Sequence, residues 1–448
     1  MKSHEIDMCN GPIWSKLLIF SIPLMLSGIL QLLFNAADMI VIGQYSTGEA
    51  LAAIGGTSSL INFFVNVIIG ISVGSNVVVA RYFGAGKSKD VHDAVHTSIT
   101  ACLILGVTVG ILGIILCRPM LQLMGTPGNV IDLSVLYVRI YFAGLPAIML
   151  YNFGSAILRA VGDTRRPLIY LTISGVINVL LNLLFVIKFG RSVDGVALAT
   201  IISQAVSAVL VLRCLMHSDG PYKLTLKDLK INKILLGKIL QVGLPAGIQG
   251  MIFSLSNIVI QSSVNAYGSV AMEGNTACQS IEGFVYTSMN AVYQTTLSFV
   301  SQNYGAGKFA RIKAVAVRCL ILCLIIGITM GNLVYLFGHP LLALYKPNES
   351  VIAYGLIRMK VICTTYVTCG LMEVLCGILR GLGYGVLPMI VSLIGACGLR
   401  ILWIVTYYAD HKSLPVLYAS YPISWTITII AHIICILIVW KRTSLHKQ

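Results

Sequence analysis

The chain has 448 residues, of which 57% are apolar and only 10% are charged, and its mean hydropathy is +0.88. A soluble globular protein carries about 25% charged residues, so this composition excludes a soluble globule and indicates an integral membrane protein. The formal net charge of +15 does not indicate a nucleic-acid-binding protein, because the lysines and arginines gather in alternate loops between apolar segments.

Twelve apolar segments follow one another along the chain, and about 20 apolar residues are enough for a helix to cross a bilayer. Each segment is predicted to be helical, because an open strand would leave backbone groups unpaired in lipid. The N-terminal stretch MKSHEIDMCNGPIW has acids and no clear cleavage site, so we expect no removable signal peptide. The predicted spans are 14–42, 51–80, 91–117, 132–158, 167–188, 195–216, 236–266, 276–301, 314–338, 351–379, 386–408 and 415–440.

The basic residues predict the orientation of these spans in a cell membrane. If the N-terminus is cytoplasmic, most of the 31 lysines and arginines fall in cytoplasmic loops and termini, as the positive-inside rule requires. Both termini and the basic segment YKLTLKDLKINK (222–233) are then cytoplasmic, and the segment lies near lipid head groups. The twelve cysteines are scattered without zinc-site spacing, so we interpret them as buried thiols and expect no cofactor.

An internal repeat divides the chain into two halves. A shift of 221 residues aligns the GAGK stretch 84–87 with GAGK at 305–308, and ILRAVGDTRRPL (157–168) with ILRGLGYGVLPM (378–389). The GAGK stretches do not fit a phosphate-binding loop, because Arg81 replaces its first glycine and Phe309 replaces the magnesium-binding hydroxyl in the second copy. We predict an all-α protein with a six-helix lobe (1–216), a cytoplasmic linker (217–235) and a second six-helix lobe (236–448), related as a parallel repeat.

All but three of the sixteen acids fall in termini, loops or the ends of predicted helices, and the three inside spans are Asp38, Glu282 and Glu373. An ionisable group at mid-bilayer costs roughly 2.5 to 3.5 kcal/mol, so each is a functional hypothesis by default. Because the charged form is disfavoured there, such a carboxyl group can load and release a proton.

Polar residues in the first half share helix faces with Asp38 or face it from other spans. Gln31, Asn35 and Asp38 follow helical spacing, with Phe34 beside them. Carboxylate, amide and hydroxyl oxygens together can surround a proton or Na⁺, and the alternative is hydrogen bonding between helices. The fifth and sixth spans carry the further stripes Ser174, Asn178, Asn182 and Thr200, Gln204, Ser207.

The second half carries an acidic and aromatic helix face suited to a flat organic cation. A polar stripe on the preceding span accompanies it, and Glu373 is a further candidate. The alternative for Glu282 is an ion pair with Arg400 or Lys360. The face consists of Glu282, Tyr286, Met289 and Tyr293, and the stripe of Asn257, Gln261 and Asn265.

Several stretches together resemble the multidrug and toxic compound extrusion (MATE) transporters, in their bacterial DNA-damage-inducible-like branch. These stretches are IPLMLSGILQLLFNAADMIVIGQY, NVVVARYFGAGK, ILRAVGDTRRPL, INVLLNLLFV, VDGVALATIIS, QSIEGF and ILRGLGYG, and the similarity covers the whole chain. The resemblance implies twelve helices in two lobes, and export of cationic drugs driven by inward flow of Na⁺ or H⁺.

The resemblance also implies roles for individual residues. Asp38 is similar to the family's coupling-ion carboxylate, with Asn178 and Thr200 as its partners and Asn152 as a weaker match; Asp38 and Asn178 would hold Na⁺ if Na⁺ is the coupling ion. Many relatives have an aspartate where this chain has Asn182, which leaves one acid in the first-lobe site.

Two other function classes remain open at this stage. A flippase for lipid-linked sugars would have a strongly cationic cavity and more spans, whereas twelve spans and interior acids favour an antiporter. An intramembrane enzyme would need a DDxxD or HExxH motif, and neither occurs. We therefore expect a non-enzymatic antiporter whose partners are small organic cations and membrane lipid, with a functional monomer.

Overall fold

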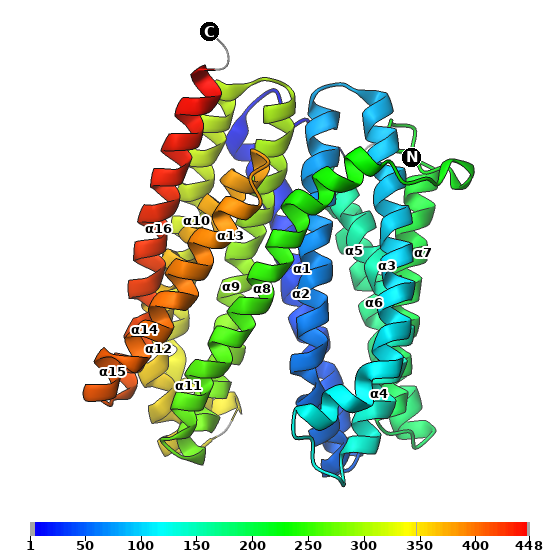
Figure 1. The fold of residues 1–448 in the computed structure, drawn as a ribbon. Helices are drawn as coiled ribbons and strands as arrows, with labels where there is room; N and C mark the ends of the chain where they lie inside the picture. Colours follow the sequence, from blue (N-terminus) through cyan, green and yellow to red (C-terminus); the bar gives the residue numbers. More distant parts are fainter. Residues whose placement is uncertain (1–4, 346, 446–448) are drawn as a thin grey trace. The chain divides into compact units, whose positions relative to one another are not determined.

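The computed structural model describes residues 5–345 and 347–445, and these residues form helices joined by short loops, with no β-strand among them (Figure 1). Residues 1–4, part of the stretch considered above for a signal peptide, lie outside the described residues. The helices of the first half are α1 (Ile13–Tyr45), α2 (Gly48–Gly84), α3 (Ser88–Leu123), α4 (Ile131–Ala143), α5 (Leu145–Ala160), α6 (Arg165–Asn182) and α7 (Val193–Met216). The helices of the second half are α8 (Lys233–Asn265), α9 (Ser269–Gly305), α10 (Phe309–Leu336), α11 (Gly338–Tyr345), α12 (Glu349–Gly381), α13 (Val386–Ser392), α14 (Leu399–Val405), α15 (Tyr407–Asp410) and α16 (Leu414–Leu445).

Each of the twelve predicted spans coincides with helix. Ten segments of the described chain are long and apolar enough to cross a membrane, and the bent pair α4 and α5 forms an eleventh. The twelfth, α9, has 37 residues but carries too many polar side chains to qualify by composition. Hydropathy alone therefore undercounts the spans at the helix that holds Glu282.

Two spans predicted as continuous helices are interrupted. The span 132–158 breaks between α4 and α5 with a bend of 47° at Gly144, which precedes Leu145 and Pro146. Pro146 lacks the N–H that would continue the helix, and the space that a Cβ of Gly144 would need is filled by Ile201, 2.4 Å away. The span 386–408 changes from α13 to a π-helical turn at Leu393–Gly398 before α14 begins.

The repeat is visible in the helix boundaries themselves. α2 and α9 begin at Gly48 and Ser269 and end at Gly84 and Gly305, so both ends are related by the shift of 221 residues found in the sequence. The starts of α3 and α10, and of α7 and α16, obey the same shift. The two-lobe internal repeat predicted from the sequence is therefore confirmed.

Each GAGK stretch is a helix-capping turn. Gly86 has φ +67° and Gly307 has φ +69°, the left-handed conformation that glycine adopts most easily at the end of a helix. The backbone N–H of Lys87 donates to the carbonyl of Tyr82 (3.1 Å), which satisfies a free carbonyl in the last turn of α2. The structure thus supports a turn, and not a phosphate cradle, at both copies.

The chain forms two compact units whose borders lie inside helices. Unit 1 contains residues 5–7 and 29–243, and unit 2 contains 8–28 and 244–445. The borders fall within α1 and α8, so the first part of each of these helices belongs to the unit formed mainly by the opposite half of the chain. The predicted linker 217–235 lies in unit 1, where the Asn232 backbone N–H donates to Thr97 of α3 (3.1 Å).

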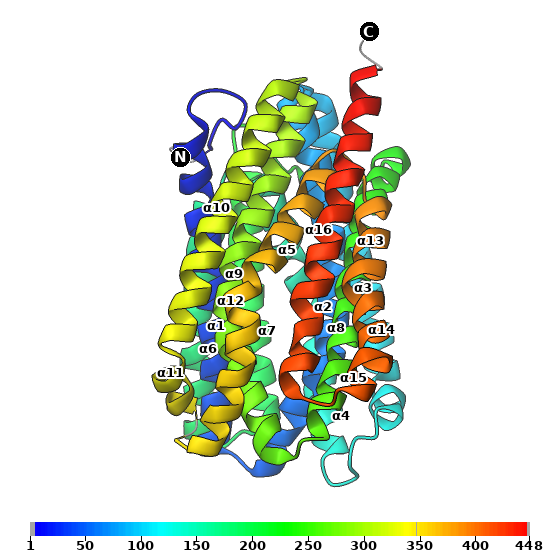
Figure 2. The ribbon, with the colours of Figure 1, turned by 90° about the vertical axis from the view of Figure 1, so that its left-hand side faces the viewer.

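One helix lies at the centre of each unit. In unit 1, α5 packs against α2, α3 and α7, and α6 packs along α7. In unit 2, α12 packs against α9, α10 and α16 (Figure 2). Glycines allow close contact in unit 2, since a Cβ at Gly331 of α10 would lie 2.2 Å from the backbone carbonyl oxygen of Cys363 on α12.

Candidate ion-coupling and substrate sites

Asp38 lies half-buried on α1, in unit 1, with polar side chains of α6 next to it. The side-chain nitrogen of Asn182 donates a hydrogen bond to one carboxylate oxygen of Asp38. The first and fifth predicted spans are therefore joined at the acid that the sequence singled out.

A glycine on α6 brings α1 this close. A Cβ added at Gly175 would lie 1.8 Å from a ring carbon of Phe34, so the ring of Phe34 rests on the backbone of α6 where only glycine leaves room. Phe34 and Asp38 are one turn apart on α1, as Gly175 and Asn178 are on α6. The packing of Phe34 on Gly175 thus determines which residues of α6 lie beside Asp38.

A chain of hydrogen bonds continues from Asp38 across three helices. The Asn182 amide also donates to Asn178 Oδ1 (3.3 Å), and Asn178 Nδ2 donates to Thr200 Oγ1 of α7 (3.5 Å). The Oδ1 atom of Asn182 is buried and, within residues 5–345 and 347–445, has no hydrogen-bond partner. A buried, unsatisfied amide oxygen beside a carboxylate is a natural ligand for a small cation.

The backbone next to Asn182 is also irregular. α6 ends at Asn182, and a π-helical turn at Leu183–Lys188 follows directly. π-helical turns inside helices often occur at functional sites, because they displace side chains and carbonyl groups from regular positions. No sequence feature indicated this turn.

Other predicted members of the first site lie apart from the chain of hydrogen bonds. Gln31 and Asn35 are exposed on α1. The amide of Asn152 donates to the carbonyl of Ile148 on its own helix (2.8 Å). Ser174 and Ser207 are buried and donate to carbonyl groups of their own helices, at Leu171 and Gln204.

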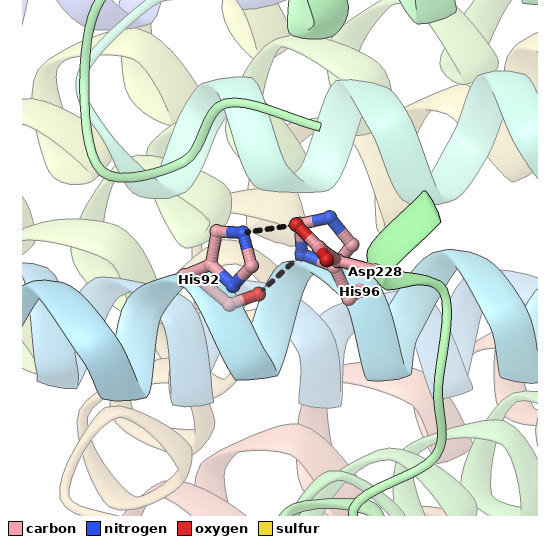
Figure 3. Close-up of side chains that lie close together, drawn as sticks. All are labelled: His92, His96 and Asp228. Atoms are coloured by element: carbon pink, nitrogen blue, oxygen red, sulfur yellow. Dashed lines mark hydrogen bonds and ion pairs between the residues drawn. The ribbon is translucent and has the colours of Figure 1, made fainter. Parts of the chain in front are cut away.

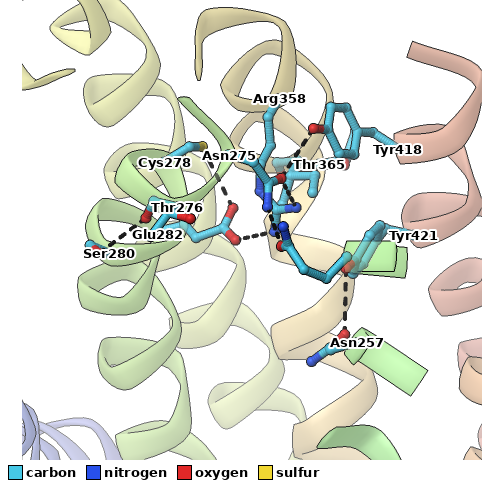
Figure 4. A network of polar contacts seen from close by, with 12 residues as sticks. Asn257, Asn275, Thr276, Cys278, Ser280, Glu282, Arg358, Thr365, Tyr418 and Tyr421 are labelled. Carbon is cyan, nitrogen blue, oxygen red and sulfur yellow. Dashed lines mark hydrogen bonds and ion pairs between the residues drawn. The ribbon is translucent and has the colours of Figure 1, made fainter. Parts of the chain in front are cut away.

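Glu282, in unit 2, forms a buried ion pair with Arg358 of α12. The guanidinium of Arg358 donates to Glu282 and also to Asn275 Oδ1 (2.9 Å), which accepts a further hydrogen bond from the Tyr418 hydroxyl (3.1 Å). Figure 4 shows this network, which joins α9, α12 and α16. The partners considered from the sequence, Arg400 and Lys360, are therefore replaced by Arg358.

The remaining residues of the predicted aromatic face differ in their exposure to solvent. Tyr286 is 38% exposed, whereas Met289 and Tyr293 are buried in helix contacts. Met289 Sδ occupies the place that a Cβ of Gly370 would need, at 2.5 Å, and the Tyr293 hydroxyl accepts a hydrogen bond from Arg380 (2.7 Å). Of these three side chains, only Tyr286 is exposed enough to meet a substrate in this conformation.

The polar stripe on α8 connects to the same network. Gln261 accepts a hydrogen bond from Asn275 (2.6 Å) and donates to Asn265 (3.0 Å). Asn257 is exposed and accepts a long hydrogen bond from the Tyr421 hydroxyl (3.4 Å). Glu373 is buried in α12 and interacts electrostatically with Arg380.

Arg358 is the member of this network that the sequence did not single out. It lies inside the predicted span 351–379, so the rule that made Glu282 a candidate, an ionisable residue within a membrane span, applied to it equally. Its partnership with Glu282 was not visible, because the two residues are 76 positions apart in the chain.

His92 and His96 of α3 and Asp228 of the linker also bring potential metal ligands within 4.8 Å of one another (Figure 3). The Nδ1 atom of His96 donates to the His92 carbonyl (2.7 Å), and its Nε2 atom accepts from the backbone N–H of Thr225 (3.0 Å). Both ring nitrogens of His96 are thus used by the backbone, and neither offers a free lone pair to a metal. The cluster is better explained as the contact that docks the linker on α3.

Comparison with known proteins establishes the family. The MatE family model matches the chain twice, at residues 23–184 and 245–406, one match in each half. The chain belongs to the MatE family. The two matches each begin at a proline, Pro23 and Pro245, inside α1 and α8, so the internal repeat is a property that the family model itself detects.

MatE relatives from bacteria match over most of their length. The "Probable multidrug resistance protein YoeA" of Bacillus subtilis (strain 168) is 28% identical over 444 residues, which cover 97% of this chain and 96% of that protein. The "FAD transporter" of Shewanella oneidensis is 26% identical over 373 residues, which cover 81% of both chains.

Solved MATE structures share the fold over the whole chain. A structure described as "Crystal structure of MATE in complex with MaL6" has a TM-score of 0.91 and 22% sequence identity, and covers 100% of both chains. Another, described as "Outward-facing conformation of a multidrug resistance MATE family transporter of the MOP superfamily", has a TM-score of 0.90 with the same identity and coverage. This MatE protein is thus a multi-pass protein of the cell membrane with the MATE fold.

Proposed function

We propose that the protein is a secondary antiporter that exports drugs or toxic organic compounds in exchange for Na⁺ or H⁺, with Asp38 as the ion-coupling group. One observation carries the proposal: a carboxylate inside a membrane span is hydrogen-bonded to an asparagine whose own amide oxygen is buried without a partner among the described residues. An ionisable group is costly inside a membrane span, so its presence there points to a functional role.

The residues around Asp38 suit a small cation. Asp38 supplies one negative charge, while Asn182, Asn178 and Thr200 supply neutral oxygens, the hard ligands that Na⁺ prefers. For H⁺, the carboxylate alone is the acceptor, and the Asn182 amide positions it. In either case binding cancels the charge of Asp38 and shifts the balance between conformations, because the ion binds one of them more tightly.

The names of relatives support export of organic compounds. The relatives include proteins named for multidrug resistance, and one is named for transport of FAD, a large aromatic anion. The substrates of this chain therefore need not be cations. The structure weakens the argument for organic cations, because the negative charge of Glu282 is already balanced by Arg358.

The test uses the full chain reconstituted in vesicles and a fluorescent organic substrate. Transport against a gradient is measured first with an imposed Na⁺ gradient and then with an imposed pH gradient, which identifies the coupling ion. Asp38→Asn keeps the size and hydrogen bonding of the side chain but removes its charge, so we expect it to insert and fold while gradient-driven transport is lost.

The matched control is Asp132→Asn. Asp132 is 77% exposed and pairs with Arg118 at 3.1 Å at the surface, so the same chemical change there should leave transport at the parent level. If Asp38→Asn transports against the gradient at near the parent rate, the coupling site lies elsewhere, and Glu373 becomes the next candidate.

A further inference from the structure

The buried charges of unit 2 do not balance. Among the described residues of this unit, the buried arginines are Arg358, Arg380 and Arg400, and the buried acids are Glu282 and Glu373. Arg358 pairs with Glu282, and Arg380 interacts with Glu373. Arg400, with 5% of its surface exposed, is left without a carboxylate in this part of the chain.

Aromatic rings surround the guanidinium of Arg400. It lies 4.2 Å from the ring centroid of Tyr421 and 5.4 Å from that of Trp425, and its Nε donates to Ser424 Oγ (3.1 Å). Within residues 5–345 and 347–445, its two terminal nitrogens form no hydrogen bond or ion pair. Cation–π contacts offset part of the cost of burial, but they leave the fixed donors of the guanidinium free for an acceptor.

The guanidinium of Arg358 adds a second positive charge close to Arg400. Arg358 lies 5.6 Å from the same Tyr421 ring, so two positive charges share one aromatic ring and only one of them has an acidic partner. Like charges at this range in a low dielectric repel each other, and buried charges are normally paired. An anion that binds beside Arg400 would remove this surplus.

The aromatic cluster around Arg400 contacts an exposed side chain. Tyr421 covers the guanidinium, and its hydroxyl is held by a long hydrogen bond (3.4 Å) to Asn257, which is exposed on α8. Tyr366 is half-buried and its ring centroid lies 5.5 Å from that of Trp425, so a third aromatic ring extends the cluster beside Arg400.

We propose that unit 2 of the transporter binds organic anions, with the acidic group of the substrate on Arg400 and its aromatic body against Trp425 and Tyr366. This inference rests on the proposed function, export of organic compounds, and names the class of compound. Carboxylates, sulfonates and phosphates all present the paired oxygens that a guanidinium binds through two parallel hydrogen bonds.

The test compares two dyes that have similar flat ring systems and opposite charge. Fluorescein is an anion and rhodamine 123 is a cation, and both are offered to vesicles that contain the full chain and carry the ion gradient that drives transport. The parent protein should transport fluorescein. Arg400→Met should reduce fluorescein transport by at least about tenfold, because a hydrogen-bonded charge is lost, and should leave or improve rhodamine transport.

Two further variants separate recognition from folding. Arg400→Lys keeps the charge without the planar pair of donors, so it should retain part of the fluorescein transport. Arg318→Gln is the matched control, because Arg318 is a cation of α10 that donates to the carbonyl of Ala314 (3.0 Å) away from this cluster, and both dyes should be transported as by the parent.

The possible outcomes are distinct. If the parent transports rhodamine but not fluorescein, or if Arg400→Met reduces both dyes equally, the inference is wrong and Arg400 is structural. If neither dye moves in the parent, the proposed function fails and the inference with it.

Discussion

Glu282 and Arg358 depend on each other, because each is buried and neither has another group of opposite charge in direct contact among the described residues. Removing one member of a buried ion pair leaves the other uncompensated, which typically costs about 3–5 kcal/mol, whereas replacing both with groups of similar size is often nearly neutral. Glu282 and Arg358 should therefore be replaced together as well as one at a time.

We predict that Arg358→Met and Glu282→Gln each lower the temperature of unfolding in detergent, and that the double variant recovers most of the loss. The measurement is thermal unfolding followed by a thiol-reactive dye, since most of the cysteines are buried. Arg400→Met serves as the contrast: Arg400 has no carboxylate partner among the described residues, so its removal should leave the unfolding temperature unchanged or raised. A loss after Arg400→Met as large as that after Arg358→Met would contradict the assignment of partners.

Asp38 and Glu282 could be recognised as candidates from the sequence alone, but their partners could not. Both were found because an acid inside an apolar span is unusual, and this needs no knowledge of the fold. The hydrogen bond from Asn182 to Asp38 crosses 144 residues of sequence, and the ion pair of Glu282 crosses 76. Helical spacing gives the face of each helix but not which faces meet, so the sequence suggested Arg400 and Lys360 as partners for Glu282 and did not identify Arg358.

At the level of helices, the approach of α1 to α6 depends on the missing side chain at Gly175. A methyl group there would lie 1.8 Å from the Phe34 ring, so the ring must leave its position, and overpacking of this kind typically costs about 1–3 kcal/mol. Because Asp38 is one turn from Phe34, displacement of the ring also disturbs the contact between Asp38 and Asn182.

We therefore expect Gly175→Ala to reduce gradient-driven transport, measured in the same vesicles as Asp38→Asn. Adding Phe34→Ala should restore part of the transport, because it removes the atoms that collide. Gly56→Ala on α2 is the matched control, since a Cβ there meets no heavy atom within 4 Å. If Gly175→Ala transports normally, the Phe34 contact does not position Asp38.

Helix boundaries were more predictable than helix irregularities. Both GAGK stretches fall between predicted spans, and helices do end there at the turns of Gly86 and Gly307, because a left-handed glycine at a helix end is a local feature. The π-helical turns at Leu183–Lys188 and Leu393–Gly398 had no such local signal. They lie within apolar segments whose composition fits α-helix equally well, so only packing against neighbouring helices selects them. The lobe and linker boundaries 1–216, 217–235 and 236–448 remain predictions.

Across the whole molecule, the two halves share a fold but differ in their buried charge. The Asp38 cluster in unit 1 has one acid and neutral amides, whereas unit 2 has three buried arginines and two buried acids among its described residues. An internal repeat that keeps the backbone and changes the charges allows one half to bind the driving cation and the other to bind the exported compound. Neither role then requires the two ligands to compete for one site.

The orientation of the whole chain can be tested with two single cysteines. Ser88 is exposed at the start of α3, after the first GAGK turn, and Gly128 is exposed between α3 and α4. If the positive-inside prediction holds, an impermeant maleimide added to intact cells labels Gly128→Cys, and it labels Ser88→Cys only after the membrane is opened. The parent protein, with half-buried Cys9 and Cys435, gives the background. The opposite pattern would place both termini outside.

The polar character of α9 has a consequence for how the protein is made. A ribosome completes α9 before α12, so Glu282 emerges 76 residues ahead of the arginine that neutralises it. A helix with an unpaired acid and few apolar residues has little tendency to leave the translocation channel for lipid alone. We therefore expect α9 to remain beside the channel until α12 arrives, and the two helices to enter the membrane as a pair. Glu282→Leu should free α9 to insert alone, which a truncated chain ending before α12 would reveal.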